Sequence, residues 1–215
     1  MRLAWKMAPA LALCACGAFA QVAADAPDDG LVRMPSSREA AVFRSPDVGF
    51  TQYKRLMFDR VSVSFVTGWI RNHPKVTEAD TERVRSRAAK GFEDELMREL
   101  VKRGRYTLAE APAPDVLRVK ARIADLDQTD PNAGLVPGVR SYSRTAGKMT
   151  LIVELYDASS GVLVGRVVDL TPPREYPEPR RLDQVFNESE SRFAFANAAR
   201  LVHEALSLAM TERPR

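Results

Sequence analysis

Residues 148–170 read KMTLIVELYDASSGVLVGRVVDL, and this stretch decides the fold. In its first half, apolar side chains recur at every second position, which is typical of a strand with one buried face. These positions are Met149, Leu151, Val153 and Leu155. The sequence DASSG then supplies a glycine-containing turn, and a second apolar run covers 162–170, so the stretch is predicted to be a β-hairpin. Because an isolated hairpin is barely stable in water, further strands and a helical cover are required.

Segments on the amino-terminal side of the hairpin supply the further strands. Residues 53–65 end in an alternation of valine and phenylalanine with serine, and 105–110 is a short extended candidate. Residues 116–126 alternate most clearly, with apolar residues on one face and Arg118, Lys120 and Arg122 on the other. Such a row of cations suits a phosphate or an acidic partner, but more often it keeps the solvent face of a strand soluble, and we adopt that interpretation.

Two amphipathic helices are predicted, over 81–103 and 188–210. The first follows Thr77, whose residue type caps helices, and it ends before Gly104. Its apolar residues recur at every fourth position: Val84, Ala88, Phe92, Leu96 and Leu100. The second begins with NESE, which resembles a capping box, and carries an alanine-rich apolar stripe suited to close packing on a sheet.

Together these elements predict an α+β fold in two layers, a mainly antiparallel sheet of four to five strands covered by two helices. The first strand, first helix and short second strand are expected to form a parallel crossover unit. A single domain is predicted over 53–211, after a tether and irregular segment over 21–52 with short extended pieces near Val32 and Val42. In the loop-like stretch 66–76, Trp69 is expected to plug the core, the alternative being an exposed recognition aromatic.

The first twenty residues, MRLAWKMAPALALCACGAFA, have the three-part pattern of an export signal and are too short to span a membrane. Two processing routes stay open. Ala-Phe-Ala before Gln21 is a cleavage site that would release a soluble periplasmic protein. Leu-Cys-Ala-Cys resembles a bacterial lipobox, in which case cleavage precedes Cys16 and Cys16 is lipidated. We favour the lipobox, which places the protein in the cell envelope, anchored to the outer membrane and facing the periplasm.

Composition narrows the function classes. The chain of 215 residues is 45% hydrophobic and 28% charged, as in ordinary soluble domains. Its net charge of +4 includes two cations of the leader, Arg2 and Lys6, so the mature domain carries only +2 and no nucleic-acid partner is predicted. Both cysteines lie in the leader, which leaves the domain without a disulfide, a thiolate metal site or a cysteine nucleophile.

Motifs of known chemistry are missing from the sequence. The two histidines, His73 and His203, have no histidine partner at metal-ligand spacing, and neither a nucleophile elbow nor a phosphate-binding glycine loop is present. The acidic tract 125–132 lacks the central glycine and closing glutamate of a calcium loop. No catalytic residue, metal site or cofactor is predicted, although pairs of carboxylates that meet only in space stay open as acid–base candidates.

The long segment 128–147 has no periodicity, which is unusual inside a compact domain and common in functional loops. It carries Arg140, Tyr142 and Arg144, with Lys148 just beyond. We take these four residues as the candidate binding loop. The alternative is a loop with no binding role, which is either disordered or merely extends the neighbouring strands.

The order of several segments is similar to that of a family of Gram-negative envelope proteins, many of them lipoproteins, known as domain of unknown function 3313. The segments are DDGLVRM, YKRLMFDRVSVSF, FEDELMRELVKRGRYTLAEAP, DVLRVKARIADLDQTDPN, LVPGVRS and KMTLIVELYDASSGVLVGRVVD. They cover most of the chain from Asp28 onward. The resemblance implies an exported α+β domain and supplies no activity.

The resulting functional hypothesis is a non-enzymatic binding or structural module, held to the membrane by its lipid anchor, that binds an envelope protein or a glycan. One alternative is a periplasmic hydrolase that uses carboxylates. Another is a carrier of an apolar ligand, which requires a cavity between the sheet and the helices. The oligomeric state is not predicted.

Overall fold

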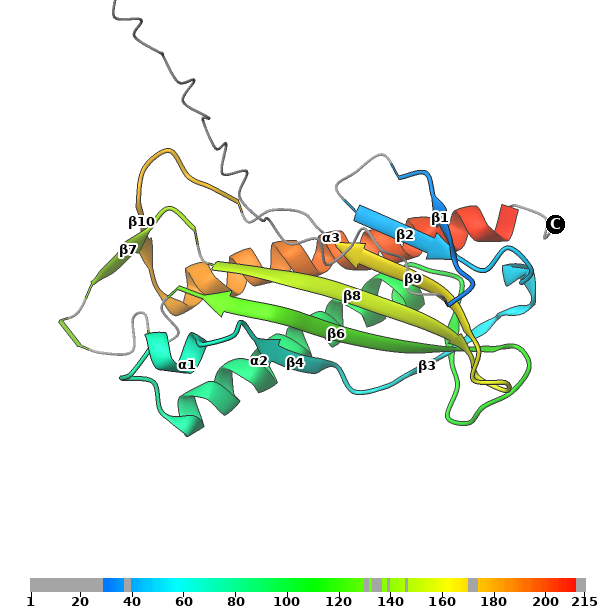
Figure 1. Cartoon of the computed structure of the whole chain (residues 1–215), viewed down its shortest axis with the longest axis horizontal. Helices are drawn as coiled ribbons and strands as arrows, with labels where there is room; N and C mark the ends of the chain where they lie inside the picture. Colours follow the sequence, from blue (N-terminus) through cyan, green and yellow to red (C-terminus); the bar gives the residue numbers. More distant parts are fainter. Residues whose placement is uncertain are drawn as a thin grey trace, which may run out of the picture.

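The computed structural model has an α+β architecture in which a large mixed sheet is backed on one face by long helices (Figure 1). It describes residues 29–36, 40–129, 132, 137–138, 140–145, 147–169 and 174–211. The predicted export leader, Cys16 and the first part of the predicted tether lie outside the described residues. No helix within the described part of the chain is long and apolar enough to cross a membrane.

The sheet has eight strands, more than the four to five predicted. Its order is β1 (Val32–Met34), β2 (Ala40–Arg44), β9 (Leu163–Asp169), β8 (Gly147–Asp157), β6 (Val116–Gln128), β3 (Arg55–Phe58) and β5 (Thr107–Leu108), with β4 (Ser62–Phe65) paired to the far half of β6. The pairs from β1 to β6 are antiparallel, whereas β3, β4 and β5 pair in parallel. The sheet is therefore mixed, and the mainly antiparallel prediction is only roughly right.

Two local features account for the additional strands. The stretch 53–65 forms two strands, because the chain breaks around Asp59, whose carboxylate is paired with Arg118 at 2.8 Å. Residues 29–52, expected to be irregular, contribute β1 and β2 at the places where extended pieces were considered. The expected parallel crossover is present, since β3 and β5 flank the first long helix and pair in parallel.

The hairpin forms as predicted from strands β8 and β9, with Val153 opposite Val167. Leu151, Val153 and Leu155 are buried in the main core, and Met149 packs against it. Asp157 holds the turn by accepting the backbone N–H groups of Ser159 and Ser160 at 3.0 and 2.8 Å. Its other oxygen accepts the phenol of Tyr53, and burial raises the pKa of Tyr53 to about 12.

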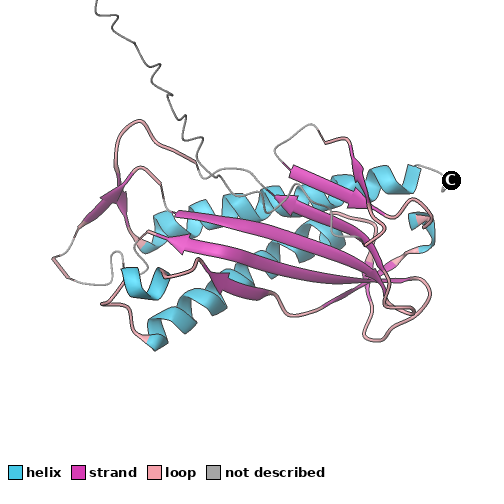
Figure 2. Cartoon of the chain, viewed as in Figure 1, coloured by secondary structure: helices cyan, strands magenta, loops and turns pink. Residues whose placement is uncertain are grey.

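Helices α2 (Glu78–Met97) and α3 (Gln184–Thr211) cover one face of the sheet (Figure 2). Thr77 and Asp80 form a reciprocal capping box at the start of α2, so the helix begins three residues before the predicted position 81. A π-helical turn, Arg98–Lys102, ends it. Helix α3 starts four residues before position 188 and is longer than predicted. The two helices meet where Phe92 and Phe195 stack with ring centroids 5.4 Å apart.

A third, short helix was missed. Residues expected to form a loop contain α1 (Trp69–Asn72), which follows Gly68 in a left-handed conformation with φ of 81°. Trp69 is buried, stacks on Phe65 at 4.4 Å and donates its indole N–H to the carbonyl of Gln128. It is a core residue, as expected, and not an exposed recognition aromatic.

The opposite face of the sheet carries a smaller apolar cluster and the row of cations. The cluster consists of Leu31, Ala41, Phe43, Ile152 and Val168. Arg118 is paired with Asp59, and the ammonium of Lys120 lies 4.4 Å from the ring centroid of Tyr156. These contacts are those of a solvated strand face and agree with the interpretation adopted from the sequence.

Candidate functional site

The long segment after β6 carries one half of a separate two-stranded ribbon. Strand β7 (Ser141–Ser143) pairs antiparallel with β10 (Arg180–Leu182), so that Tyr142 lies opposite Arg181. We call this pair the ribbon. It stands at one end of the molecule, beyond the ends of β6 and β8 and beside the start of α3 (Figure 1). The segment thus contains regular structure whose partner lies far along the chain.

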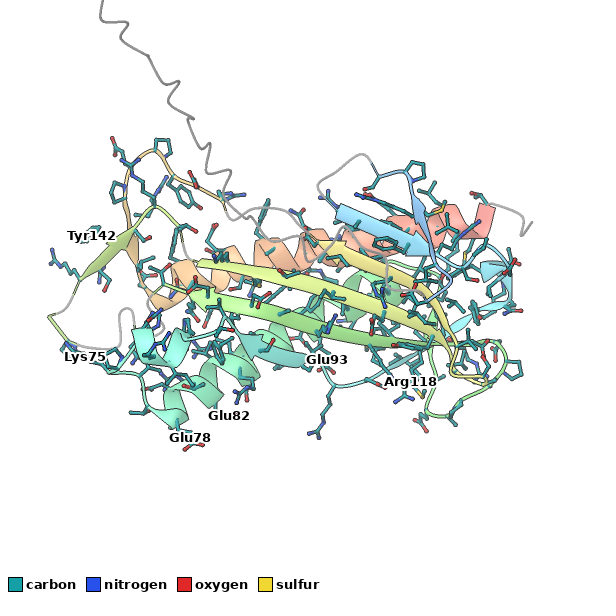
Figure 3. All side chains as sticks on the ribbon, viewed as in Figure 1. Lys75, Glu78, Glu82, Glu93, Arg118 and Tyr142 are labelled. Atoms are coloured by element: carbon teal, nitrogen blue, oxygen red, sulfur yellow. The ribbon has the colours of Figure 1, made fainter. Side chains whose placement is uncertain are left out.

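Three of the four residues predicted as a binding loop are exposed at the ribbon. Arg140, Tyr142 and Arg144 are exposed, Tyr142 to 59%, and Figure 3 places Tyr142 at the outer end of the molecule. The fourth residue, Lys148, lies instead on β8, opposite Asp127 of β6. The structure therefore separates Lys148 from the other three.

Contacts from the proline-rich connection fix the ribbon to α3. The backbone N–H of Tyr176 donates to the carbonyl of Arg144 at 3.0 Å, and its phenol donates to Glu190 of α3 at 2.7 Å. The ring centroids of Tyr176 and Phe186 lie 5.6 Å apart. The guanidinium of Arg180 lies 5.0 Å from the ring centroid of Tyr176. Sequence reasoning treated this connection only as an extended linker. An aromatic residue among prolines was the one signal that it is docked.

A polar cavity of about 280 Å³ opens between the base of the ribbon, the ends of β6, β8 and β9, and the first turns of α3. We call it the polar cavity. Its polar lining combines acids, amides, hydroxyls and cations: Asp127, Gln128, Thr145, Lys148, Asp169, Arg174, Asn187, Glu190, Ser191 and Asn197. Leu126, Met149, Leu151, Phe193 and Ala194 form its apolar part.

Asp169 is the least expected member of this lining. It is buried, and it faces the core side of the sheet, since it lies opposite Leu151 of β8. A buried carboxylate is costly without polar company, and the amides and hydroxyls of α3 line the same space. A carboxylate ending an otherwise apolar strand was the available sequence signal, but nothing in it pointed to α3.

Arg174 connects the polar cavity to the ribbon. Its guanidinium lies 4.1 Å from the ring centroid of Phe193 and 3.7 Å from the carboxylate of Glu190. A hydrogen bond with Tyr176 raises the pKa of Arg174 above its ordinary value. Mixed acceptors, donors and an exposed aromatic face suit a hydroxylated or amide-bearing ligand. The described residues contain no group of three histidine, cysteine or acidic side chains arranged for a metal ion.

Two described residues of the acidic tract noted in the sequence, Asp125 and Asn132, have structural roles. Asp125 sits at a β-bulge with φ of 52°, and this bulge returns Leu126 to the core face of β6. Asn132 accepts a hydrogen bond from Arg83 of α2 at 2.9 Å. The side-chain amide of Asn132 also donates to the Asp80 carboxylate at 3.4 Å. Hydrogen bonds from the backbone of Thr77, and then from its side chain, hold the pKa of Asp80 well below its usual range. Asn132 is thus held against the start of α2.

The two histidines lie outside the lining of the polar cavity. The His73 ring is tilted against the Trp69 ring with the centroids 4.6 Å apart, and its two ring nitrogens face the carbonyls of Trp69 and Thr129. His203 is half-buried on α3.

This chain belongs to the family described as protein of unknown function (DUF3313), whose model matches residues 26–187. The family assignment agrees with the resemblance found in the sequence and brings no activity with it. No functionally curated protein matches the sequence.

Solved structures offer distant likenesses. The PelC dodecamer from Paraburkholderia phytofirmans is 12% identical, with 78% of this chain and 96% of that chain covered and a TM-score of 0.35. A PDZ domain protein from Parabacteroides distasonis is 12% identical over 82% of this chain and 36% of that one, with a TM-score of 0.39. A homolog of a neuraminyllactose-binding hemagglutinin from Helicobacter pylori is 11% identical over 77% and 88%, with a TM-score of 0.38. Likenesses at this level carry no functional argument.

Proposed function

We propose that this protein is an exported envelope lipoprotein, anchored through Cys16 to the outer membrane, that acts as a non-enzymatic binding module for an envelope protein or a glycan. The observation that carries the proposal is the ribbon. Arg140, Tyr142 and Arg144 are exposed on or beside a short β-pair that is held to the rigid α3 helix through Tyr176 and Glu190.

Physical considerations favour the ribbon as a contact surface. Tyrosine and arginine are enriched among the residues that dominate protein interfaces, because they bring a large apolar area together with hydrogen-bond donors. A ribbon fixed before binding loses less conformational entropy than a free loop when a partner arrives. The adjoining polar cavity would extend the contact for a glycan, whose hydroxyl groups match its acids and amides.

The anchor is compatible with this arrangement. The leader contains the lipobox-like sequence before Cys16, and thirteen positions separate Cys16 from Asp29, where the described chain starts. A connection of that length reaches at most about 45 Å. The domain would then stay close to the membrane and meet partners in the adjacent periplasm. The intact mass of the mature protein tests the anchor, because a diacylated amino terminus at Cys16 supports it and an unmodified terminus at Gln21 contradicts it.

Partner capture tests the ribbon. The triple variant Arg140→Ala, Tyr142→Ala, Arg144→Ala should lose most of the partner recovered from crosslinked envelopes by affinity purification. A matched control removes two exposed cations and one exposed apolar side chain near the opposite end of β8: Lys54→Ala, Arg105→Ala, Val162→Ala. The control should retain capture. Equal recovery of the partner with both triple variants would contradict a role of the ribbon in partner binding.

A carboxylate hydrolase is the second candidate, because Asp127, Asp169 and Glu190 line the same polar cavity. A hydrolase of this kind uses one carboxyl group as acid and another as base or nucleophile. Purified protein should then cleave envelope glycans or peptides, and Asp169→Asn or Glu190→Gln should abolish the cleavage. Absence of turnover on both substrate classes would leave the binding module as the better description.

A further inference from the structure

A second hollow lies at the end of the molecule away from the ribbon, between the edge of the sheet and the last turns of α3. It has a volume of about 590 Å³, within the range typical of ligand sites. We call it the apolar groove. One wall is formed by β2 and β9, and the other by residues 201–209 of α3.

The groove lies between α3 and the strands at one side of the sheet. Helix α3 contacts β8, β9 and β2, and β1 continues the sheet beyond β2. Small side chains on the helix wall, Ala205 and Ala209, leave space there. Gly165 lies on the core-facing side of β9, opposite Leu155. A β-carbon at position 165 would lie 3.3 Å from Cδ1 of Leu155, so the Leu155 side chain already covers that part of the strand wall.

The lining is mostly hydrocarbon. Phe50, Leu155, Val167, Leu201 and Leu206 are all buried and belong to the main core. The lining residues with charged side chains are Arg44, Arg166 and Glu204, and Arg166 is already paired with Glu154 and Asp29. Such a lining offers an interior ligand few hydrogen bonds, so the inner part of the ligand must itself be apolar.

The length of the helix wall suits a linear ligand. This wall runs from Leu201 to Ala209, a rise of about 12 Å along α3. The opposite wall is formed by the paired strands β2 and β9. Leu208, which is 60% exposed, also lines the groove and would extend the apolar contact outward.

We propose that the apolar groove binds one acyl chain, from a free fatty acid or a single-chain lipid, with the head group at the rim beside Arg44 and Glu204. This site is separate from the ribbon, and the inference does not depend on the proposed partner capture.

Chain length gives the sharpest test. Each additional buried methylene should lower the dissociation constant about fourfold, until the groove is full and the affinity levels off. The full chain with Cys16→Ala, which cannot be lipidated at that position, is titrated with saturated fatty acids of increasing length by calorimetry. A dissociation constant independent of chain length would overturn the proposal.

A groove-filling variant locates the site. Ala205→Phe should weaken binding of the longest fatty acid at least tenfold, whereas Ala79→Phe, on the exposed first turn of α2, should leave it unchanged. Leu208→Asp serves as a second variant, since its exposed position tolerates polarity without loss of the fold. If both groove variants bind the longest fatty acid as tightly as the unsubstituted protein does, the ligand does not lie in the groove.

Lysophospholipids carrying the same acyl chains distinguish the two sources. If they bind with the same dependence on chain length as the fatty acids, the groove accepts the chain of a membrane lipid. If only the fatty acids bind, the ligand is a free fatty acid with its carboxylate at the rim. Either result supports the acyl-chain site, and failure of both series overturns it.

Discussion

The phenol of Tyr176 donates a hydrogen bond to the Glu190 carboxylate at 2.7 Å and thereby joins the proline-rich connection to α3. Arg174 lies 3.7 Å from the same carboxylate. The backbone N–H of Tyr176 also donates to Arg144, directly after β7. Because the Tyr176 ring also contacts Arg180 of β10, one residue links both strands of the ribbon to the body of the protein.

Loss of the phenol should loosen the ribbon and little else. Tyr176→Phe removes the bond to Glu190 at a cost of about 1 kcal/mol locally. We expect faster amide hydrogen exchange in residues 141–143 and 180–182, with unchanged exchange in β6 and β8. Unchanged exchange in the ribbon would show that the contact does not hold it.

The capping box should contribute measurably to global stability. Thr77 accepts the N–H of Asp80 at 3.1 Å, and Asp80 accepts the N–H of Thr77 at 3.0 Å. Thr77→Ala should lower the free energy of unfolding by about 1 kcal/mol in chemical denaturation. Ala79→Ser, at an exposed position in the same turn, leaves the cap in place and should cost about 0.5 kcal/mol or less, so it is the control for helix propensity alone. A loss no larger than that of the control would contradict the role of the cap.

Asp80 should make this cap sensitive to acid. Its pKa is lowered in the folded protein by hydrogen bonds from Thr77 and then from Arg83, so the folded state favours the charged form. The stabilisation is present above the unfolded pKa, near 4, and is lost as the pH falls through the folded value. The difference in denaturation midpoint between the native chain and Asp80→Asn should therefore shrink on acidification below about pH 4. A difference that is constant with pH would argue against this linkage.

The stacked phenylalanines between the helices should contribute far more to stability than an exposed phenylalanine on α3. Phe92 is fully buried against Phe195, and Phe92→Ala should destabilise the protein by about 3–5 kcal/mol. Phe193 is 47% exposed, and Phe193→Ala should cost about 1 kcal/mol or less. Comparable losses for the two variants would contradict the placement of the main core.

Sequence reasoning found the elements that are specified locally. The hairpin of β8 and β9 and the stripes of α2 and α3 are periodic over many residues, and the cap at Thr77 lies within four residues. Strands β1 and β5 are only three and two residues long, so the sequence indicated them as short extended pieces, near Val32 and within 105–110, but gave no period from which their pairing could be predicted. The break at Asp59 depends on Arg118, which comes from another strand.

The candidate site was found only in part, for a similar reason. Arg140, Tyr142 and Arg144 stand out in a segment without periodicity, and their exposure follows from that setting. The pairing of β7 with β10 joins segments almost forty residues apart, and no local pattern predicts it. Asp169, Asn187 and Glu190 meet at the polar cavity only once β9 and α3 are packed together.

Site-specific photocrosslinking at Tyr142 in living cells tests the binding module most directly. A photoreactive phenylalanine analogue replaces Tyr142, and the control carries it at Val162, which is 54% exposed beyond the opposite end of β8. We predict a discrete, light-dependent adduct in the envelope fraction for position 142 and none for position 162. No adduct at 142, or the same adduct at both positions, would contradict partner capture by the ribbon.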